Sequence, residues 1–358
     1  MLKLVSVPET SQAAVADQVV SVGIDLGRSK WAFAVRWGGQ LQRRFATPGE
    51  LRHLAALVEQ YQHGPLQVTY EACGFGYEIA WYLQERGIPV TVVAPVTLER
   101  APGARVKTDR IDAAALALKL ERGLLKGIYV PSRRQHEERQ LSRTYGKALK
   151  ARQRAQVQIR ALMQEQGRIG PSPRDGWAAY TAWLKAQRDV PAPVQRSVNE
   201  LGALREAGAQ SAQRLKAAVL KLAACPEYAS LVAALRRQPG VGPFTAIRLV
   251  LEIGTMERFR TAASFAHYLG LTPGEYSSSA TVRRGHILKC GPGYVRSWLL
   301  ECAWKSLRPG QDAALRACFE RLAPRIGKKR AIVAVARRLA LRLRARWIEA
   351  LQPPAQAA

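Results

Sequence analysis

Four acidic residues are spaced so that their side chains could bind divalent metal ions together. Asp109 and Asp112 lie three residues apart at the start of an Ala- and Leu-rich segment, 107–122, that predicts a helix, and residues with this spacing share one helical face. Asp25 and Glu71 each lie in or just after a short run of β-type residues. Carboxylate oxygens are the ligands that Mg²⁺ and Mn²⁺ prefer. The four acids therefore predict a divalent-metal site.

Each acid also has an ordinary interpretation. Asp109 could be a helix-start acid that the helix dipole favours, and Asp112 a solvated helix residue. The setting of all four favours the metal site, because strand ends at Asp25 and Glu71 would present carboxylates to the predicted helix. Two metal ions that clamp a scissile phosphate lie about 3.5–4 Å apart and need anionic ligands from several directions.

The segments that must position these acids follow the order βββαβαβα. The predicted strands are 19–25, 30–37, 40–47, 67–72 and 89–94, with a hairpin turn at Gly38-Gly39; the predicted helices begin at Pro48, run over 79–86, and include the acid-bearing segment. The acids fall on the first strand, the fourth strand and the last helix. This arrangement resembles the ribonuclease H-like fold of RuvC-type nucleases, in which Asp25 would be the bridging ligand.

Two later segments have the spacing of coiled-coil helices. Residues 138–167 place Leu141, Tyr145, Ala148, Arg152, Ala155, Ile159, Leu162 and Gln166 on one seam, and after a Pro/Gly-rich connection, 170–193, a second seam holds Leu201, Leu204, Gly208, Ser211, Leu215, Ala218 and Leu222. The spacing predicts an antiparallel helical hairpin or a pairing with another subunit. A plain helical spacer fits the same pattern. The first segment also has a cationic exposed face, with ten Lys or Arg and three Glu between 131 and 168.

The C-terminal part contains two motifs that suit nucleic acid. Residues 238–246 include Pro239-Gly240-Val241-Gly242 between two predicted helices, which predicts a helix-hairpin-helix turn whose N–H groups reach a phosphate. A tight structural turn is the alternative. Further on, three serines, 277–279, precede a basic strip containing Arg283, Arg284, His286 and Lys289.

The composition indicates a polyanionic partner. The formal net charge of the 358 residues is +28, and residues 321–346 hold ten Lys or Arg, Lys328, Lys329 and Arg330 among them, without an acid. Because all its charges are positive, this run repels itself unless nucleic acid or counterions neutralise it. A helix face exposed to solvent would have the same pattern of basic residues. No apolar run of membrane-spanning length and no signal-peptide pattern is present, so we expect a cytoplasmic, nucleoid-associated protein. The five scattered cysteines predict neither disulfides nor a zinc site.

Taken together, these motifs resemble the IS110 family of transposases and the related invertases that flip pilin genes. The resemblance rests on the acids, the heptad linker, Pro-Gly-Val-Gly, the segment Leu269-Gly270-Leu271-Thr272-Pro273 with Tyr276-Ser277-Ser278, and Arg283-Arg284-Gly285-His286-Ile287 with Lys289 and Gly291. It implies a catalytic set of Asp25, Glu71, Asp109, Asp112 and the nucleophile Ser277, with Ser278 as the alternative. Ser279, Ala280 and Pro292 depart from the family pattern.

The resemblance implies a DNA transposase or site-specific recombinase that cuts and rejoins strands at element ends and target by serine attack, assisted by Mg²⁺ or Mn²⁺. It further implies a structured guide RNA and a homodimer or tetramer. A metal-dependent, junction-resolving nuclease that uses water is the second hypothesis, and a non-enzymatic nucleic-acid scaffold is the third. The expected division is a leader over 1–18, a RuvC-like domain over 19–130, a helical linker over 131–230, a mostly α C-terminal domain over 231–350 and a tail over 351–358.

Overall fold

The computed structural model describes residues 18–61, 63–95, 109–275 and 284–352. The chain forms two compact units, Met1–Arg133 (unit 1) and Arg134–Ala358 (unit 2). Unit 1 is mixed α/β and the described part of unit 2 is mostly helical, which confirms the predicted fold class at this level. The predicted leader lies almost wholly outside the described residues.

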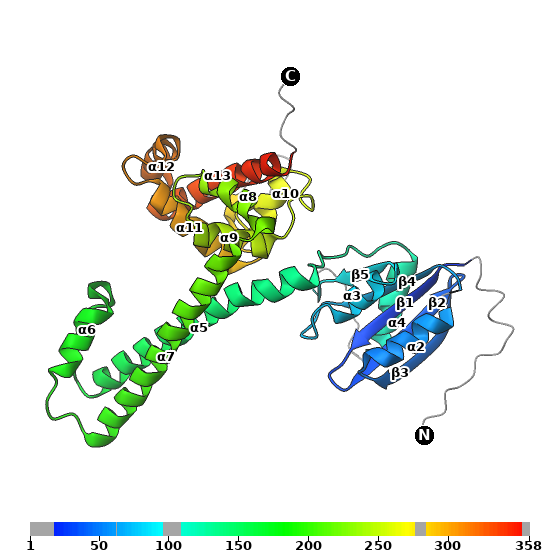
Figure 1. Ribbon diagram of the computed structural model, residues 1–358, viewed down its shortest axis with the longest axis horizontal. Coiled ribbons are helices and arrows are strands. Elements are labelled where there is room, and N and C mark those ends of the chain that lie inside the picture. Colours follow the sequence, from blue (N-terminus) through cyan, green and yellow to red (C-terminus); the bar gives the residue numbers. More distant parts are fainter. Residues whose placement is uncertain (1–17, 62, 96–108, 276–283, 353–358) are drawn as a thin grey trace. The chain divides into compact units, whose positions relative to one another are not determined.

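Unit 1 is built on a five-stranded sheet with the strand order β3-β2-β1-β4-β5 (Figure 1). The strands are β1 (Val20–Leu26), β2 (Lys30–Trp37), β3 (Gln40–Pro48), β4 (Leu66–Glu71) and β5 (Val90–Val93). The first three strands pair antiparallel, whereas β4 and β5 continue the sheet parallel to β1. The predicted order of elements is therefore confirmed, and the strand boundaries lie within one residue of expectation. The helix predicted to begin at Pro48 begins three residues later, at Leu51, because Pro48 still belongs to β3.

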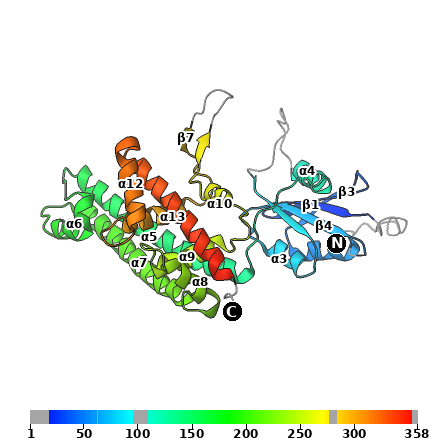
Figure 2. The ribbon, with the colours of Figure 1, turned by 90° about the horizontal axis from the view of Figure 1, so that it is seen from above.

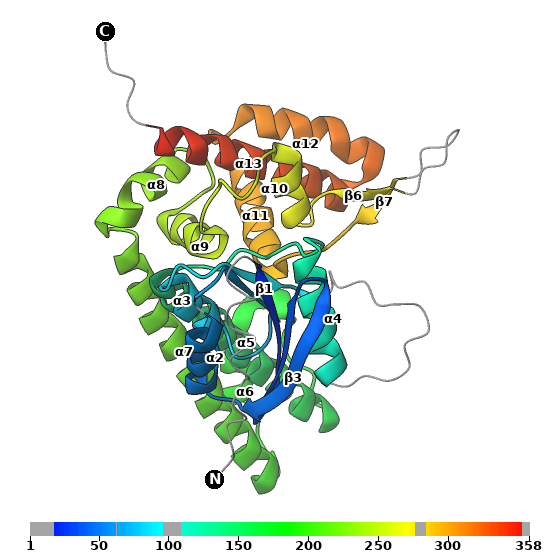
Figure 3. The same cartoon turned by 90° about the vertical axis from the view of Figure 1, so that its right-hand side faces the viewer.

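Helices cover both faces of this sheet (Figure 3). α2 (Leu51–Tyr61) and α3 (Glu78–Gln84) pack on one face with the larger apolar side chains, including Ile24 and Tyr70. α4 (Asp109–Glu121) packs on the other face through a cluster of four alanines, Ala32, Ala34, Ala113 and Ala117. Small residues let this helix lie close to the strands.

Unit 2 contains two long antiparallel helices, α5 (Arg133–Glu165) and α7 (Ala192–Leu222) (Figure 1). Their backbones approach closely at Gly208, where an added Cβ would lie 3.1 Å from the Arg152 nitrogen. The α5 seam is buried or half-buried up to Leu162. The α7 seam is partly wrong: Leu204 is 63% exposed, and Ala212 and Val219 are buried instead. The two helices do form the antiparallel hairpin that was one of the predicted alternatives, whereas coiled-coil packing along the whole seam stays a prediction.

The connection between these helices is more ordered than its Pro/Gly content suggests. It contains the short 3₁₀ helix η2 (Pro173–Asp175) and α6 (Gly176–Lys185). Tyr180 of α6 stacks on Trp177 and packs at a tilt against Trp183, and the Arg160 guanidinium lies 3.9 Å from the centre of the Tyr180 ring. An aromatic cluster therefore closes this end of the hairpin.

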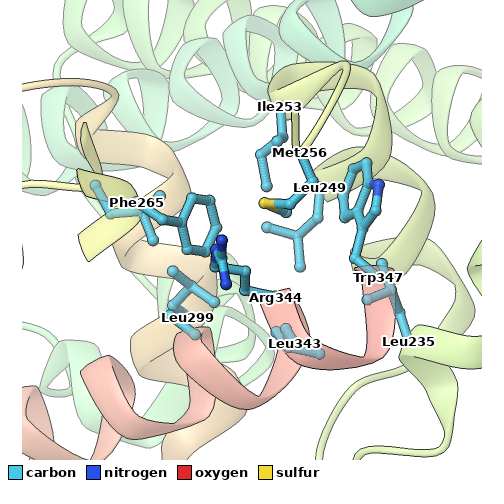
Figure 4. A pocket seen from close by; sticks show the side chains of 11 residues that line it. Leu235, Leu249, Ile253, Met256, Phe265, Leu299, Leu343, Arg344 and Trp347 are labelled. Atoms are coloured by element: carbon cyan, nitrogen blue, oxygen red, sulfur yellow. The ribbon is translucent and has the colours of Figure 1, made fainter. Parts of the chain in front are cut away.

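The remaining helices of unit 2 surround a second apolar core. They are α8 (Pro226–Arg236), α9 (Pro243–Ile253), α10 (Ala262–Tyr268), α11 (Gly293–Ser306), α12 (Ala313–Ile326) and α13 (Lys328–Leu351). The cavity inside this core, between Leu249, Phe265 and Trp347 (Figure 4), has a volume of about 10 Å³. That is room for one water at most, so it is a packing gap and not a ligand site.

Two features interrupt the helices of unit 2. A two-stranded antiparallel ribbon, β6 (Pro273–Glu275) with β7 (Arg284–Ile287), projects from them (Figure 2). Gly327, with φ of 83°, separates α12 from α13 within the basic run 321–346. Among the described helices none alone has the length and apolar composition to cross a membrane, although α7 and α8, which meet at a 98° bend, meet both criteria when taken together.

Candidate active site

Asp25 and Glu71 lie at the same edge of the sheet in unit 1, on neighbouring strands. The parallel register pairs Ile24 with Tyr70, so Asp25 and Glu71 each follow the last paired residue. Successive side chains alternate between the two faces of a sheet. Ile24 and Tyr70 belong to the core under α2 and α3, and hence both acids belong to the opposite face, which α4 covers.

The antiparallel neighbour of β1 supports this placement. Asp25 lies directly opposite Ala32 of β2, and opposed residues of an antiparallel pair share a face. Ala32 packs against Ala113 and Ala117 of α4. Both Asp25 and Glu71 are half-buried.

α4 brings the remaining acids to this face. It approaches β1 so closely at Gly23 that an added Cβ there would lie 2.5 Å from the Ala117 backbone nitrogen. Asp112 immediately precedes Ala113 and is half-buried. Asp109 begins the helix, but its side chain lies outside the described residues. The sequence interpretation missed Gly23; the alternation of Gly23 with the apolar residues of β1 is the signal that could have found it.

Asp25, Glu71 and Asp112 offer the carboxylate oxygens that a divalent metal ion prefers, and their elements bring them to the same face of the sheet. Within the described residues, however, no three His, Cys, Asp or Glu side chains lie close enough together to hold an ion. A complete metal site would have to include Asp109, whose side chain is not described. The four-acid metal site therefore stays a prediction.

The serine segment, 277–279, lies in the sequence between β6 and β7 of unit 2. The predicted nucleophile Ser277, its alternative Ser278, and Arg283 lie outside the described residues, between the two strands. Of the basic strip, His286 and Lys289 are exposed and Arg284 begins β7. Lys289 has a φ of 55°, a conformation that costs a non-glycine residue about 1–2 kcal/mol. The ribbon itself was not anticipated from the sequence.

The Pro-Gly-Val-Gly turn joins α8 to α9, but its two glycines have different surroundings. Gly240, with φ of 88°, packs against α11: an added Cβ would lie 2.5 Å from the Ser306 hydroxyl and 2.6 Å from the Cys302 carbonyl oxygen. Ser306 also donates a hydrogen bond to the Pro239 carbonyl (2.7 Å). Gly242 is exposed, with nothing within 4 Å of an added Cβ. Gly240 therefore has a structural role in the packing of α11, and the predicted phosphate contact stays a prediction for both glycines.

The interior of unit 2 holds several charged side chains. Glu252 accepts two hydrogen bonds from Arg143 (2.9 and 3.0 Å) and one from the Tyr294 hydroxyl (2.9 Å); burial, aided by Glu252, raises the pKa of Tyr294 to about 12. Arg248 is buried with its guanidinium 3.6 Å from the Trp298 ring centre, and burial lowers its pKa to about 10. These contacts tie α5, α9 and α11 together.

The remaining predicted nucleic-acid residues lie at the start of α13. Lys328, Lys329 and Arg330 occupy its first turn and are all exposed. Beyond this turn Ile332, Val335, Ala336, Leu339 and Leu343 are buried, whereas Arg338, on another side of the helix, is exposed. α13 is therefore amphipathic, with a packed face and a face that carries basic residues.

Two family models match separate parts of the chain. The model of an IS110-type DEDD transposase matches residues 22–167, and that of the transposase IS116/IS110/IS902 family matches residues 232–317. The first range contains all four acids and the second contains the ribbon and the segment between its strands.

Curated relatives match along most of the chain. "Putative transposase y4qE" of Sinorhizobium fredii is 32% identical over 332 residues, which cover 90% of this chain and 77% of that protein. "Probable family 20 transposase" of Pseudomonas aeruginosa is 30% identical over 71% of this chain and 72% of that protein. A solved structure, "T. thermophilus RuvC in complex with Holliday junction substrate", matches 31% of this chain and 99% of that chain at 16% identity, with a TM-score of 0.22. So low a TM-score leaves the fold of unit 1 to be argued from its own strand order.

Proposed function

Because this chain belongs to the IS110 family of DNA transposases, we propose that it cuts and rejoins the strands of a mobile element by serine attack, with a metal-binding acidic site on a ribonuclease H-like domain. The observation that carries the proposal is the convergence in unit 1. Asp25 and Glu71 lie on adjacent strand ends, on the face that α4 covers with Asp112 in its first turn.

The sheet supports a ribonuclease H-like assignment. Its order β3-β2-β1-β4-β5, with three antiparallel strands followed by two parallel ones, is the arrangement that this fold requires of the predicted βββαβαβα order. Parallel strands end at one edge of the sheet, so we expect the acids on β1 and β4 to lie near the start of α4. Asp25, between β2 and β4 in the sheet, has the central position expected of a bridging ligand.

Asp25, Glu71, Asp109 and Asp112 would hold the Mg²⁺ or Mn²⁺. When bound, the ion would supply Lewis-acid stabilisation of the charge that develops on a phosphate during its transfer. The secondary structure would hold these carboxylates in place. Asp25 and Glu71 lie on hydrogen-bonded strands, and Asp112 lies on a helix that packs against Gly23. The half-buried setting of Asp25 and Glu71 limits the water around them.

The covalent step would use Ser277. Its Oγ forms a bond to a DNA phosphorus while the bond from that phosphorus to the 3′-oxygen breaks; the serine proton is lost and the leaving oxygen gains one, giving a 5′-phosphoserine ester and a free 3′-hydroxyl. Attack by a different 3′-hydroxyl on the ester then joins the strands and restores the serine. The bond energy is conserved through the ester, so that joining needs no nucleotide cofactor.

The partners of this reaction are DNA at the element ends and the target. We further propose a structured guide RNA from the element, which family membership and the net charge of +28 support, and a homodimer or tetramer, which family membership supports. Basic residues on the described surface, such as Lys289 and Lys329, suit either nucleic acid, since phosphate contacts do not depend on sequence.

A trapping experiment tests the proposal. The full-length protein is incubated in Mg²⁺ with a plasmid that carries the coding sequence and the genomic DNA on both sides, together with RNA transcribed from it, and is then denatured. A protein–DNA adduct at Ser277 is expected by peptide mass spectrometry. Ser277→Ala should lose adduct and strand exchange but still bind. Asp25→Ala, Glu71→Ala and Asp112→Ala should do the same, because each removes a metal ligand and leaves the basic surface unchanged.

The controls separate this mechanism from its alternatives. An adduct that persists in Ser277→Ala but disappears in Ser278→Ala would move the nucleophile by one residue. Nicking retained by the Ser277→Ala, Ser278→Ala double variant would show that water is the nucleophile, as in a structure-specific nuclease. Full cleavage by any two of the acid variants would contradict the metal site.

A further inference from the structure

The two strands of the ribbon leave the helices of unit 2 at one tightly joined root. Leu288 N–H donates a hydrogen bond to the Thr272 carbonyl (2.9 Å), and Lys289 N–H donates one to the Gly270 carbonyl (3.3 Å). These bonds continue the pairing of Pro273 with Ile287 toward the core. The root therefore consists of residues 268–272 on one side and 287–291 on the other.

Arg296, in the first turns of α11, binds both sides of this root. Its Nη1 donates to the Leu269 carbonyl (3.0 Å) and the Cys290 carbonyl (2.6 Å), and its Nη2 donates to the Lys289 carbonyl (3.0 Å). No carboxylate of a described residue forms an ion pair with it. Its donors thus serve three backbone carbonyls, and the planar guanidinium fixes their relative directions.

Two glycines make the root too tight to shift. Gly270 and Gly291 have φ of 65° and 70°. A Cβ on Gly270 would lie 2.8 Å from the Cys290 nitrogen and 2.7 Å from Arg296 Nη1, and a Cβ on Gly291 would overlap the Tyr268 carbonyl oxygen. Between them Lys289 is held at φ of 55°. Such a conformation persists only when the surroundings over-determine it.

We infer that Arg296 is a positioning residue for strand transfer, because it fixes the point from which the ribbon, and with it the serine segment, leaves unit 2. This inference rests on the proposed serine chemistry. Arg296 would not touch DNA or the reacting atoms. Its effect would come from geometry, since a misplacement of about 1 Å in a reacting group can cost about 10²-fold in rate. A lysine has the charge but not the planar fork that joins three carbonyls.

The experiment compares Arg296→Met, Arg296→Lys and, as matched control, Arg308→Met, an exposed residue that follows α11. For each full-length protein the rate of Ser277 adduct formation, the affinity for the plasmid DNA and the thermal unfolding midpoint are measured. Arg296→Met and Arg296→Lys should form adduct about 10²-fold more slowly at saturating DNA, with affinity within about twofold of wild type. Arg308→Met should match wild type in all three.

Each outcome decides the inference. Adduct formation at the wild-type rate in Arg296→Lys or Arg296→Met overturns it while leaving the serine mechanism intact. A slow Arg296→Lys that keeps the wild-type unfolding midpoint supports it, and this variant decides if Arg296→Met fails to fold. A loss of DNA affinity equal to the loss of rate would make Arg296 a binding residue and overturn the inference. Absence of any adduct in the wild-type protein removes the proposed function and this inference together.

Discussion

At the scale of single residues, the sequence indicated which side chains could do chemistry, but it indicated less well which groups surround them in the fold. Asp25 and Glu71 were predicted at strand ends, and the register places them on adjacent strands and on the α4 face. Gly23 and Arg296 were not foreseen. The only signal for Gly23 is its alternation with the apolar residues of β1. The role of Arg296 depends on carbonyl groups from segments distant in sequence, and these leave no pattern in composition or spacing.

Substitution of Lys289 tests whether the positive φ at the ribbon root is kept because this lysine binds DNA. Lys289→Gly should raise the free energy of unfolding by up to about 1 kcal/mol, because glycine adopts a positive φ without steric cost. It should also weaken DNA binding and reduce the slope of log affinity against log salt concentration by about one unit, as expected when one phosphate is no longer neutralised. Urea unfolding and binding over a salt series measure the two effects.

Lys289→Ala is the matched control for that variant. It removes the same charge but keeps a Cβ at φ of 55°, so it should lose the same binding without gaining stability. A Lys289→Gly protein that binds with wild-type salt dependence would show that the lysine does not bind a phosphate, and the strain would then need another explanation.

At the scale of elements, hydrophobic period identified the strands and helices of unit 1 and, in unit 2, the long helices α5, α7 and α13. It did so because burial of one face sets the period of a strand or helix. The α7 seam shows the limit of this reasoning: Leu204 fits the predicted seam by type, yet Ala212 and Val219 are the buried residues. The close approach of α5 at Gly208 selects small residues for the interface, and a count of apolar positions does not contain that information. α6 was missed because prolines and glycines flank it.

The Pro-Gly-Val-Gly turn gives a prediction at this scale. Gly240→Ala should lower the free energy of unfolding by about 2 kcal/mol or more, since it combines a positive φ with overlap against Ser306 and Cys302. Gly242→Ala should change it by no more than about 1 kcal/mol, because its φ is −86° and its surroundings are open. Urea unfolding of both variants measures the difference.

DNA binding by the same pair locates the phosphate-binding position. If the N–H groups at the start of α9 bind a phosphate, a Cβ on Gly242 would block the approach of that phosphate. The Gly242→Ala protein should then bind DNA more weakly, while its free energy of unfolding stays within the range given above. Equal affinity of Gly242→Ala and wild type would leave the turn as a purely structural connection between α8 and α9.

At the scale of the whole molecule, the net charge of +28 is the dominant property. Part of it lies inside unit 2: Arg248 is buried against Trp298 and donates to the Ser142 hydroxyl, whereas the Arg143–Glu252 pair is neutral and does not change the net charge. Composition alone could not separate these arginines from surface ones, because their burial follows from the packing of α5, α9 and α11. The cations free to meet nucleic acid are therefore fewer than the formal charge implies, and they must be tested by location.

The basic first turn of α13 provides that test. Lys328→Gln, Lys329→Gln and Arg330→Gln in one protein should reduce the slope of log affinity against log salt concentration by up to about 0.9 for each phosphate that these side chains neutralise. The control replaces Arg174, Lys185 and Arg188, exposed residues beside η2 and α6, by Gln. Both proteins lose three charges. If the α13 residues bind phosphates, only the first protein changes its slope by about two units or more, whereas equal changes in both would mean that overall charge, and not this helix, governs binding.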